Sequence, residues 1–372
     1  MNNSNRDHLF HAMREVPTPA LVIDRDALDR NIALMAARAR TAGRSLRPHA
    51  KTHKSAVIAR KQIEAGAIGI CCATLPELQA MADARIGGLL LTAPIQDAAK
   101  TDALIAVAQQ TPITIAVDHP AQIHMLAAKL PADGEPIGVV VDVDVGQKRT
   151  GVCDVRDAIA IAKLVAADKR FKFSGLQGYA GHAQHIPDFT GRAREAARVS
   201  ALLVEYIAGL RQSGFEVTIV SGSGTGTHDF DIEHQPFTEI QAGSYIFMDA
   251  DYARVENRSG ESLPFECSLF MLATVTSANR PGQVTIDSGT KSLAVNGPAP
   301  HLILGAPAGT AFQFAGDEHG LLTFPEGSQT PAPGTRILMS VTHCDPTVNL
   351  FGVMHAVSAE GKVERWPVLG RN

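Results

Sequence analysis

Two lysines near the start of the chain, Lys51 and Lys54, lie in the segment SLRPHAKTHK, between an extended run and a helical pattern. A lysine in a pocket of low polarity beside other cations has a lowered pKa and can attack an aldehyde. Lys51 comes directly after the extended run, whereas Lys54 is expected in the following helix with its side chain exposed. Lys51 is therefore the candidate nucleophile, and a solvated surface lysine is the alternative.

The run SGSGTG, residues 221–226, is a candidate phosphate site. Its three glycines allow backbone N–H groups to converge on one point, and the serine and threonine hydroxyls add further donors. A glycine-rich turn alone is a weak signal, and a plain loop is the alternative. A phosphate loop and a nucleophilic lysine in one domain would together indicate pyridoxal 5'-phosphate.

A third candidate lies near the C-terminal end, where His343 and Asp345 stand two residues apart in MSVTHCDPTVNL. On a strand, side chains two apart project from the same face. We therefore expect this pair to share one face, with Cys344 turned away from it. An imidazole and a carboxylate suit a divalent ion whose remaining positions are filled by water or substrate. The spacing is not specific, and a surface or core pair is the alternative.

The elements that must position these residues alternate between short apolar runs and longer helical patterns. Strands rich in valine and isoleucine without polar alternation are typical of parallel sheets covered on both faces. About eight such units predict a (β/α)8 TIM barrel, and a doubly wound open sheet is the competitor. The expected strands are PALVID, SLRPHA, AIGICCAT, GLLLTA, PITIAVD, IGVVVDVDVG, FKFSGLQGY and EVTIVSGSG.

The alternation of apolar runs and helical patterns ends after about residue 258. Residues 264–372 contain β-type runs separated by glycine- and proline-rich turns, and they lack helical periodicity. We therefore expect a barrel over residues 16–258 and a second, all-β domain over residues 259–372, with residues 1–15 packing on the latter.

Active sites of (β/α)8 barrels lie at the carboxyl ends of the strands. Besides Lys51 and the loop after the last expected strand, several polar residues follow strands in this way. We expect His49 to point into the barrel beside the cofactor. We also expect either His182 or His185 to act in catalysis or to orient the metal. The set is His49, Arg149, Gln177, Tyr179, His182 and His185.

Taken together, the segments VPTPALVID, LRPHAKTHK, GYAGH, SGSGT and HCDPTVNL resemble one family. It comprises D-threonine aldolases, 3-hydroxy-D-aspartate aldolases and eukaryotic-type D-serine dehydratases. The resemblance covers nearly the whole chain and implies an alanine-racemase-like arrangement, a pyridoxal-phosphate barrel with a β domain. It also implies a homodimer.

The resemblance assigns roles to individual residues. Lys51 would be the Schiff-base lysine, and Arg149 would approach the phenolic oxygen of the cofactor. The phosphate would be held by the loop, with Tyr179 nearby. The loop residues concerned are Ser223, Gly224 and Thr225.

In this family a metal lies beside the cofactor, at the place of His343 and Asp345. Dehydratase members tend to show His-x-Cys, which favours Zn²⁺, whereas His-x-Asp favours Mn²⁺ or Mg²⁺ and resembles the aldolases. Zn²⁺ stays an alternative here. The resemblance therefore predicts an aldolase that cleaves a β-hydroxy-D-amino acid, of the D-threonine or 3-hydroxy-D-aspartate type, into glycine and an aldehyde.

Three other functions stay open. A D-serine or 3-hydroxy-D-aspartate dehydratase is the close alternative. A racemase is more distant, because it would need an acid or base on the opposite face, typically a tyrosine of the β domain, and no tyrosine follows Tyr252. A protein of cofactor homeostasis would be a barrel alone, so residues 264–372 argue against it.

Composition argues against other classes of protein. The chain has 372 residues and a formal net charge of −4, whereas nucleic-acid or membrane-surface partners favour a strong basic excess. No apolar run reaches the roughly 18–20 residues that span a bilayer, and the N-terminus lacks the apolar core of a signal peptide. Five cysteines without a CxxC spacing do not form a disulfide pattern. We expect a cytoplasmic protein that binds small molecules.

Overall fold

The computed structural model describes residues 6–233 and 236–371. It divides into two compact units, each assembled from segments that are distant in the sequence. The β unit comprises Met1–Ala33, Thr52–Ser55 and Ser244–Val368, and the barrel unit comprises Leu34–Lys51, Ala56–Gly243 and Leu369–Asn372.

Eight short strands of the barrel unit form one parallel sheet in the order β2-β9-β8-β7-β6-β5-β4-β3. Beyond β2, His49 forms a parallel bridge with Cys71 of β3, and the Cys71 N–H donates to the Pro48 carbonyl at 2.9 Å. This bridge joins the two ends of the order, so the sheet closes into the predicted barrel. The strands are β2 (Ser45–Leu46), β3 (Cys71–Cys72), β4 (Leu89–Leu91), β5 (Ile113–Val117), β6 (Ile137–Asp142), β7 (Phe171–Gly178), β8 (Ile219–Gly222) and β9 (Glu239–Ile240).

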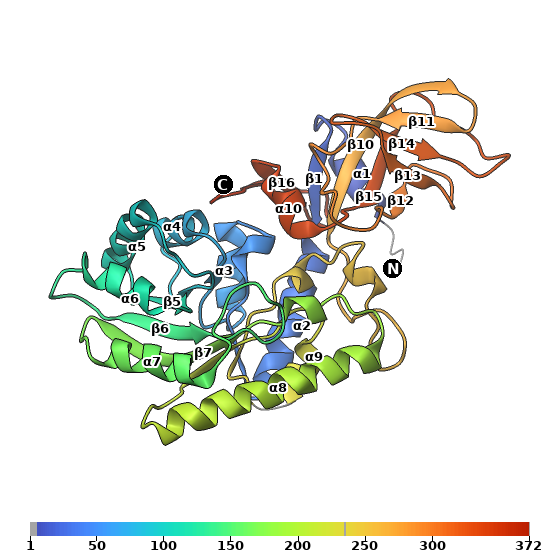
Figure 1. Cartoon of the computed structure of the whole chain (residues 1–372). Helices are drawn as coiled ribbons and strands as arrows, with labels where there is room; N and C mark the ends of the chain where they lie inside the picture. The colour runs from blue at the N-terminus through green and yellow to red at the C-terminus, as the bar shows by residue number, and fades with distance from the viewer. Residues whose placement is uncertain (1–5, 234–235, 372) are drawn as a thin grey trace. The chain divides into compact units, whose positions relative to one another are not determined.

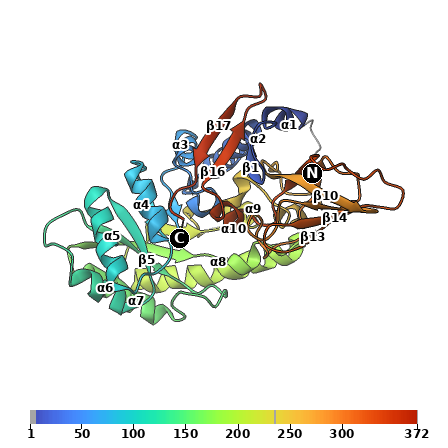
Figure 2. The ribbon, with the colours of Figure 1, turned by 90° about the horizontal axis from the view of Figure 1, so that it is seen from above.

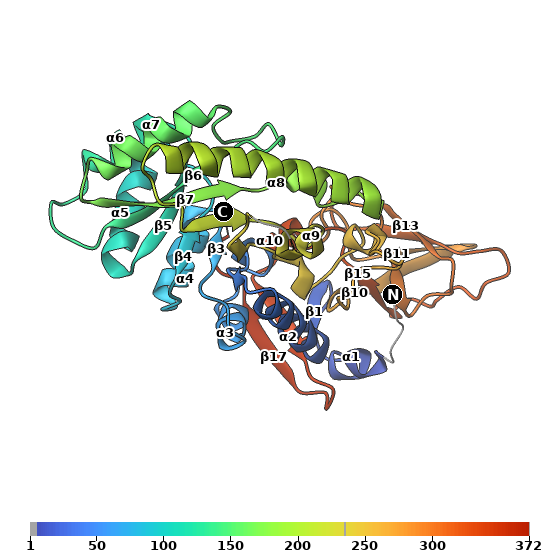
Figure 3. The same ribbon diagram turned by 90° about the horizontal axis from the view of Figure 1, so that it is seen from below.

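Helices cover the outside of the barrel strands, as Figure 1 shows for α4 to α7. Five of them begin at a side-chain N-cap, which satisfies an otherwise unpaired backbone N–H. The long helix α8 packs against α7 and β7 (Figure 3). Across the described residues, no helix has the length and apolar character that a membrane crossing needs. The helices are α3 (Ala56–Glu64), α4 (Leu75–Asp83), α5 (Ala98–Gln110), α6 (Pro120–Ala127), α7 (Val155–Ala166), α8 (Phe189–Gln212) and α9 (His228–Glu233), and α2 (Arg25–Thr41) runs from the β unit into the barrel unit.

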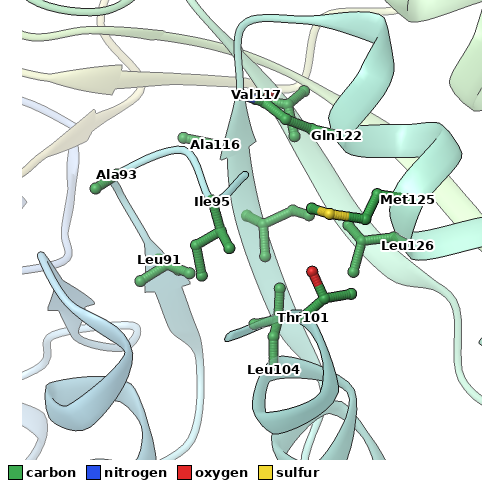
Figure 4. A pocket seen from close by; sticks show the side chains of 11 residues that line it. Leu91, Ala93, Ile95, Thr101, Leu104, Ala116, Val117, Gln122, Met125 and Leu126 are labelled. Atoms are coloured by element: carbon green, nitrogen blue, oxygen red, sulfur yellow. The ribbon is translucent and has the colours of Figure 1, made fainter. Parts of the chain in front are cut away.

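Apolar side chains fill the layer between strands and helices. In Figure 4, Leu91 and Val117 of strands β4 and β5 face Leu104 of α5 and Met125 and Leu126 of α6. The cavity left among them has a volume of about 10 Å³, which is the lower limit for a single water molecule. This layer is packed core and offers no room for a ligand.

The run PALVID was expected to be the first barrel strand, and this prediction is wrong. As β1 (Ala20–Asp24) it pairs antiparallel with β10 (Leu269–Arg280) and parallel with β16 (Val353–Val357), all in the β unit. A short apolar strand is buried on both faces in either position, so its composition does not identify its sheet. The strands that decide the matter come from the C-terminal third of the chain.

The eighth barrel strand is instead β9, which the sequence did not reveal because two residues, one of them charged, form no apolar run. Glu239 of β9 is buried, and Arg47 donates to both of its carboxylate oxygens, from Nε at 3.0 Å and from Nη2 at 2.9 Å. Because β9 pairs with β2 and with β8, this ion pair stabilises the part of the sheet where β2 enters.

The β unit contains a largely antiparallel sheet, so the second β domain is confirmed in outline. Its main path is β13-β14-β11-β10-β1-β16-β17, with β15 paired to β10 and β12 paired to β15. Figure 2 shows β16 and β17 as a hairpin. The two strands β12 and β17 were not predicted. The remaining strands are β11 (Gln283–Ile286), β12 (Leu302–Leu304), β13 (Ala311–Phe314), β14 (Gly320–Thr323), β15 (Arg336–Ser340) and β17 (Val363–Pro367).

Two short helices interrupt this unit, so it is not purely β. They are α1 (Asp7–Ala12) and α10 (Cys344–Asn349). Both are shorter than the window over which helical periodicity can be recognised in a sequence.

The units also divide the chain differently from the boundaries expected at residues 16–258 and 259–372. The β unit includes the N-terminal segment as far as Ala33 and resumes at Ser244. One reason is Asn31, which is buried and whose side-chain amide donates to the carbonyls of Ile246 and Glu266 at 3.0 and 2.7 Å. These hydrogen bonds join the start of α2 to the segment that precedes β10.

We expect Arg47→Ala to lower the free energy of unfolding of its unit by about 3–5 kcal/mol, because it leaves a buried carboxylate without its cation. Arg30 and Glu266 form a matched two-pronged pair whose arginine side chain is 58% exposed. Arg30→Ala should therefore cost at most about 1 kcal/mol. Urea denaturation followed by circular dichroism compares the two, and equal losses would contradict the structural role of Glu239.

Candidate active site

A buried polar network occupies the barrel at the carboxyl ends of its strands. The side-chain amide nitrogen of Gln177 donates to Asp142 Oδ1 and to the Thr92 carbonyl, both at 2.9 Å. The amide nitrogen of Gln241 donates in turn to Gln177 Oε1 at 3.2 Å and to Ser221 Oγ at 2.8 Å. Burial raises the pKa of Asp142 to about 6, against the hydrogen bonds that lower it. The network joins β6, β7 and β8 at the level where a barrel site forms.

This network bears on the expectation that Gln177 contacts a cofactor. Its side-chain amide nitrogen has two hydrogens, and the two acceptors Asp142 and Thr92 use both. Gln177 therefore holds strand ends together, and its direct contact with a cofactor stays a prediction.

His49 and Lys51 follow β2 at the same end of the barrel, as predicted. His49 is buried, and its Nε2 lies 3.1 Å from Thr92 Oγ1, so it joins the network. Lys51 lies in the 3₁₀ turn Ala50–Thr52 and is partly exposed. A lysine at the end of a barrel strand and open to solvent is placed to meet a ligand.

Lys54, by contrast, does not lie in a helix with its side chain exposed, so that prediction is wrong. The helix α3 begins at Ala56, and Lys54 precedes it with a positive φ of 48° and is only 5% exposed. A positive φ turns the chain before the helix starts. The side chain is therefore buried rather than exposed on a helix surface.

The glycine loop after β8 has the properties of an anion site. Ser223 has a positive φ of 70° and is 2% exposed. Its Oγ is buried and makes no hydrogen bond with the part of the chain that the structure describes. A buried hydroxyl without a partner costs free energy unless a ligand accepts its hydrogen. A phosphate in this loop would supply that acceptor, so the residues present fit a phosphorylated cofactor.

Gln184, which was not predicted as a site residue, stabilises this loop through hydrogen bonds. It is fully buried, accepts from the Gly226 N–H at 2.9 Å, and donates to Thr227 Oγ1 at 3.0 Å and to the Ala180 carbonyl at 3.1 Å. A Cβ atom on Gly224 would lie 2.3 Å from Gln184 Oε1. Gln184 therefore leaves no room for a side chain at position 224. No sequence motif indicates that this glutamine contacts the loop.

Arg192 of α8 brings a buried positive charge to the same loop, and it too was missed. It is 1% exposed, and its Nε donates to the Gly226 carbonyl at 2.6 Å. Its guanidinium carbon lies 5.9 and 5.6 Å from the ring centroids of Phe189 and Phe230. The only sequence signal was an arginine on the buried face of a long helix, which is unusual.

Four predicted barrel residues remain: Arg149 and Tyr179 lie together, His182 pairs with Glu195, which was not predicted, and His185 is the fourth. The guanidinium of Arg149 lies 5.8 Å from the ring centroid of Tyr179, so these two are brought together. His182 Nε2 lies 2.7 Å from Glu195 Oε1, and Glu195 also binds Arg198, whose hydrogen bond is the main cause that lowers the pKa of Glu195. His185 is half-buried in the turn before α8.

The pair His343 and Asp345 does not lie on a strand, so the predicted geometry is wrong. The strand β15 ends at Ser340, His343 is the N-cap of α10, and Asp345 lies in the first turn of that helix. Thr52 Oγ1 donates to Asp345 Oδ1 at 2.8 Å, and the thiol of Cys344 lies 3.4 Å from the same oxygen. Cys344 is thus buried beside Asp345 rather than turned away from it.

Asp249, a further residue that was not predicted, explains why the helix begins here. It is fully buried, and its carboxylate accepts from the backbone N–H groups of Tyr252 and Cys344, both at 2.9 Å. The bond to Cys344 satisfies the first N–H of α10. The dipeptide Asp345-Pro346 was a sequence signal for this turn, because proline is tolerated in the first turn of a helix.

The donor set of His343 and Asp345 fits a metal site that keeps open positions. Within residues 6–233 and 236–371, no three His, Cys, Asp or Glu side chains gather in a way that could hold a metal ion, so this pair would supply only two of the ligands. One imidazole and one carboxylate leave the other positions to water or substrate, as a hard divalent ion tolerates. His343 Nδ1 lies 3.1 Å from the Asn296 amide nitrogen, so its ring orientation is set by a neighbour.

We expect Gly224→Val to release bound pyridoxal phosphate on dialysis, because the added side chain collides with Gln184 and displaces the loop. Gly87→Val is the matched control, since a Cβ on Gly87 meets no atom within 4 Å. Cofactor absorbance after dialysis measures retention. Full occupancy in the Gly224 variant would place the phosphate elsewhere.

Comparisons with known proteins agree with this geometry. The model of the alanine racemase N-terminal domain matches residues 23–251, and that of the putative serine dehydratase domain matches residues 268–357. The chain is 37% identical to D-threonine aldolase of Arthrobacter sp, covering 96% of this chain and 94% of the relative. It is 33% identical to 3-hydroxy-D-aspartate aldolase of Paracoccus denitrificans (strain Pd 1222), covering 96% and 92%.

Among solved structures, D-threonine aldolase from Filomicrobium marinum superposes with a TM-score of 0.91 at 36% identity, covering 96% of this chain and 95% of that one. D-threo-3-hydroxyaspartate dehydratase from Delftia sp. HT23 superposes with a TM-score of 0.85 at 26% identity, covering 95% and 98%, and a form with a cysteine replaced by alanine is metal-free. With a closed barrel, a β unit and likeness over nearly its whole length, the chain belongs to the family of D-threonine aldolases and 3-hydroxy-D-aspartate aldolases, which are lyases of alanine-racemase-like fold.

Proposed function

We propose that this chain is a lyase that uses pyridoxal phosphate and a divalent metal to cleave a β-hydroxy-D-amino acid into glycine and an aldehyde. The observation that carries the proposal is the strand order β2-β9-β8. Lys51 follows β2, and the glycine loop follows β8. Two steps between neighbouring strands separate their ends by about 10 Å. One cofactor can therefore meet the lysine with its aldehyde carbon and the loop with its phosphate.

Each residue then has a definite task. When bound, pyridoxal phosphate supplies an electron sink for a carbanion, and a divalent ion supplies a Lewis acid for a hydroxyl group. Lys51 would hold the cofactor through its aldehyde group. Arg149, whose guanidinium lies near the Tyr179 ring, would bind the phenolic oxygen. Ser223, Gly224 and Thr225 would hold the phosphate.

His182 is the proposed base, because the carboxylate of Glu195 lies beside its Nε2 and fixes the ring. Its Nδ1 is then the atom that takes the proton of the substrate hydroxyl. This arrangement, a base oriented by a third group, is common in enzymes. His185 is the second candidate for this role.

His343 and Asp345 are the proposed metal ligands. The carboxylate favours Mn²⁺ or Mg²⁺, and Zn²⁺ is the alternative ion. Asp345 also favours the aldolase over the dehydratase reaction, because the resemblance assigns His-x-Asp to the aldolases and His-x-Cys to the dehydratases. Dehydration of D-serine or 3-hydroxy-D-aspartate is the second candidate function, and product analysis separates the two.

The substrate is proposed at the level of its class, with D-threonine and 3-hydroxy-D-aspartate as the two types that the relatives' names suggest. Homodimer formation and a cytoplasmic location, which we expected from the sequence, stay predictions.

We expect Lys51→Ala to lose both turnover and the absorbance band of the cofactor joined to a lysine, because the variant lacks the amine proposed to make that bond. Lys100→Ala, on the exposed surface of α5, is the control and should keep both. Retention of the band in the Lys51 variant would contradict the assignment.

We expect removal of the metal by a chelator to stop glycine formation. The absorbance band of the cofactor joined to Lys51 should stay, because the proposed metal acts on the substrate hydroxyl whereas the lysine holds the cofactor. Adding Mn²⁺ or Mg²⁺ should restore activity. Glycine and aldehyde are measured before and after metal removal, with metal content checked by mass spectrometry. Undiminished cleavage at near-zero metal content would refute the metal-dependent reaction.

A further inference from the structure

We propose that Thr52 is a positioning residue, which sets the orientation of the Asp345 carboxylate for metal binding. The inference rests on the proposed function, because it takes His343 and Asp345 as metal ligands.

The hydrogen bond from Thr52 to Asp345 is well formed. Thr52 Oγ1 lies 2.8 Å from Asp345 Oδ1, and Thr52 is fully buried. A hydroxyl that donates to a carboxylate makes a charge-assisted hydrogen bond, which is stronger than a neutral one, and burial protects it from competing water. The bond therefore restricts rotation of the carboxylate.

The backbone of Asp345 is restrained independently. Asp249 accepts from the Cys344 N–H at 2.9 Å, which fixes the start of α10, and Thr342 Oγ1 donates to the Ala294 carbonyl at 2.6 Å just before it. These bonds hold the main chain, whereas Thr52 and the Cys344 thiol, 3.4 Å from the same oxygen, act on the side chain. The loss of the Thr52 hydroxyl would therefore alter the direction of the carboxylate without moving the helix.

Thr52 also follows Lys51 directly in the chain. Neighbouring Cα atoms across a trans peptide bond are about 3.8 Å apart. The proposed positioning residue is therefore the chain neighbour of the candidate nucleophile.

The chemistry of the hydroxyl, rather than the size of the side chain, is what the inference demands. Valine has nearly the shape of threonine but no donor, and serine keeps the donor in a smaller side chain. Loss of a hydrogen-bond partner behind a metal ligand typically weakens metal binding about 10–100-fold.

The test measures Mn²⁺ affinity by electron paramagnetic resonance, on enzyme that carries pyridoxal phosphate and has been stripped of metal. We expect Thr52→Val to bind Mn²⁺ about 10–100-fold more weakly, with the cofactor band retained. Thr52→Ser should bind within about threefold of the unsubstituted chain, because the donor remains. The control is Thr101→Val, since Thr101 is equally buried and its hydroxyl donates to the carbonyl of Asp97, the N-cap of α5.

Two further variants keep the test decisive. Thr52→Ala removes the same hydroxyl and replaces the valine variant if that one does not fold. His343→Ala removes a proposed ligand and should abolish binding. Unchanged affinity in the valine or alanine variant, with binding lost in the His343 variant, overturns the role of Thr52 alone. An equal loss in the serine variant also overturns it, and unchanged affinity in the His343 variant overturns the metal assignment itself.

Discussion

The hydrogen-bonded ladder β2-β9-β8 is the constraint on which the candidate site depends. It brings the end of the strand before Lys51 within two strand spacings of the glycine loop, although more than half of the barrel's chain lies between them. Its middle strand has only two residues and includes a buried glutamate. That strand is stable because Arg47 pairs with Glu239 and so offsets the cost of burying a carboxylate.

Buried polar side chains then determine the shape of the loops at this end of the barrel. Gln177 and Gln241 connect the ends of the strands by hydrogen bonds. Gln184 and Arg192 hydrogen-bond to the backbone of Gly226 in the glycine loop. Leaving any one of their partners unsatisfied would cost roughly 1–3 kcal/mol. The loops therefore have one favoured arrangement before a ligand arrives, which lowers the entropy cost of binding. The Ser223 hydroxyl is the exception, because it has no hydrogen-bond partner in the part of the chain that the structure describes.

In the β unit, buried or neighbouring polar side chains likewise determine the geometry of the proposed metal ligands. Asp249 starts the helix α10, Thr52 orients the carboxylate of Asp345, and Asn296 lies against the ring of His343. A pair of ligands with few protein donors has little stability of its own, so its geometry depends on these neighbours. Thr52 and Asp345 both belong to the β unit, so this hydrogen bond lies within one unit.

The sequence by itself determined the class of fold, seven of the eight barrel strands, and the lysine and glycine loop at their ends, because these depend on apolar runs and on residue types near in the chain. Only the tertiary structure placed β1 in the β unit, identified β9, and showed that Lys54 is buried. The same holds for Gln184, Arg192 and Asp249, and for the helix that carries Asp345. Each of these is decided by partners distant in sequence, whose pairing leaves no local pattern.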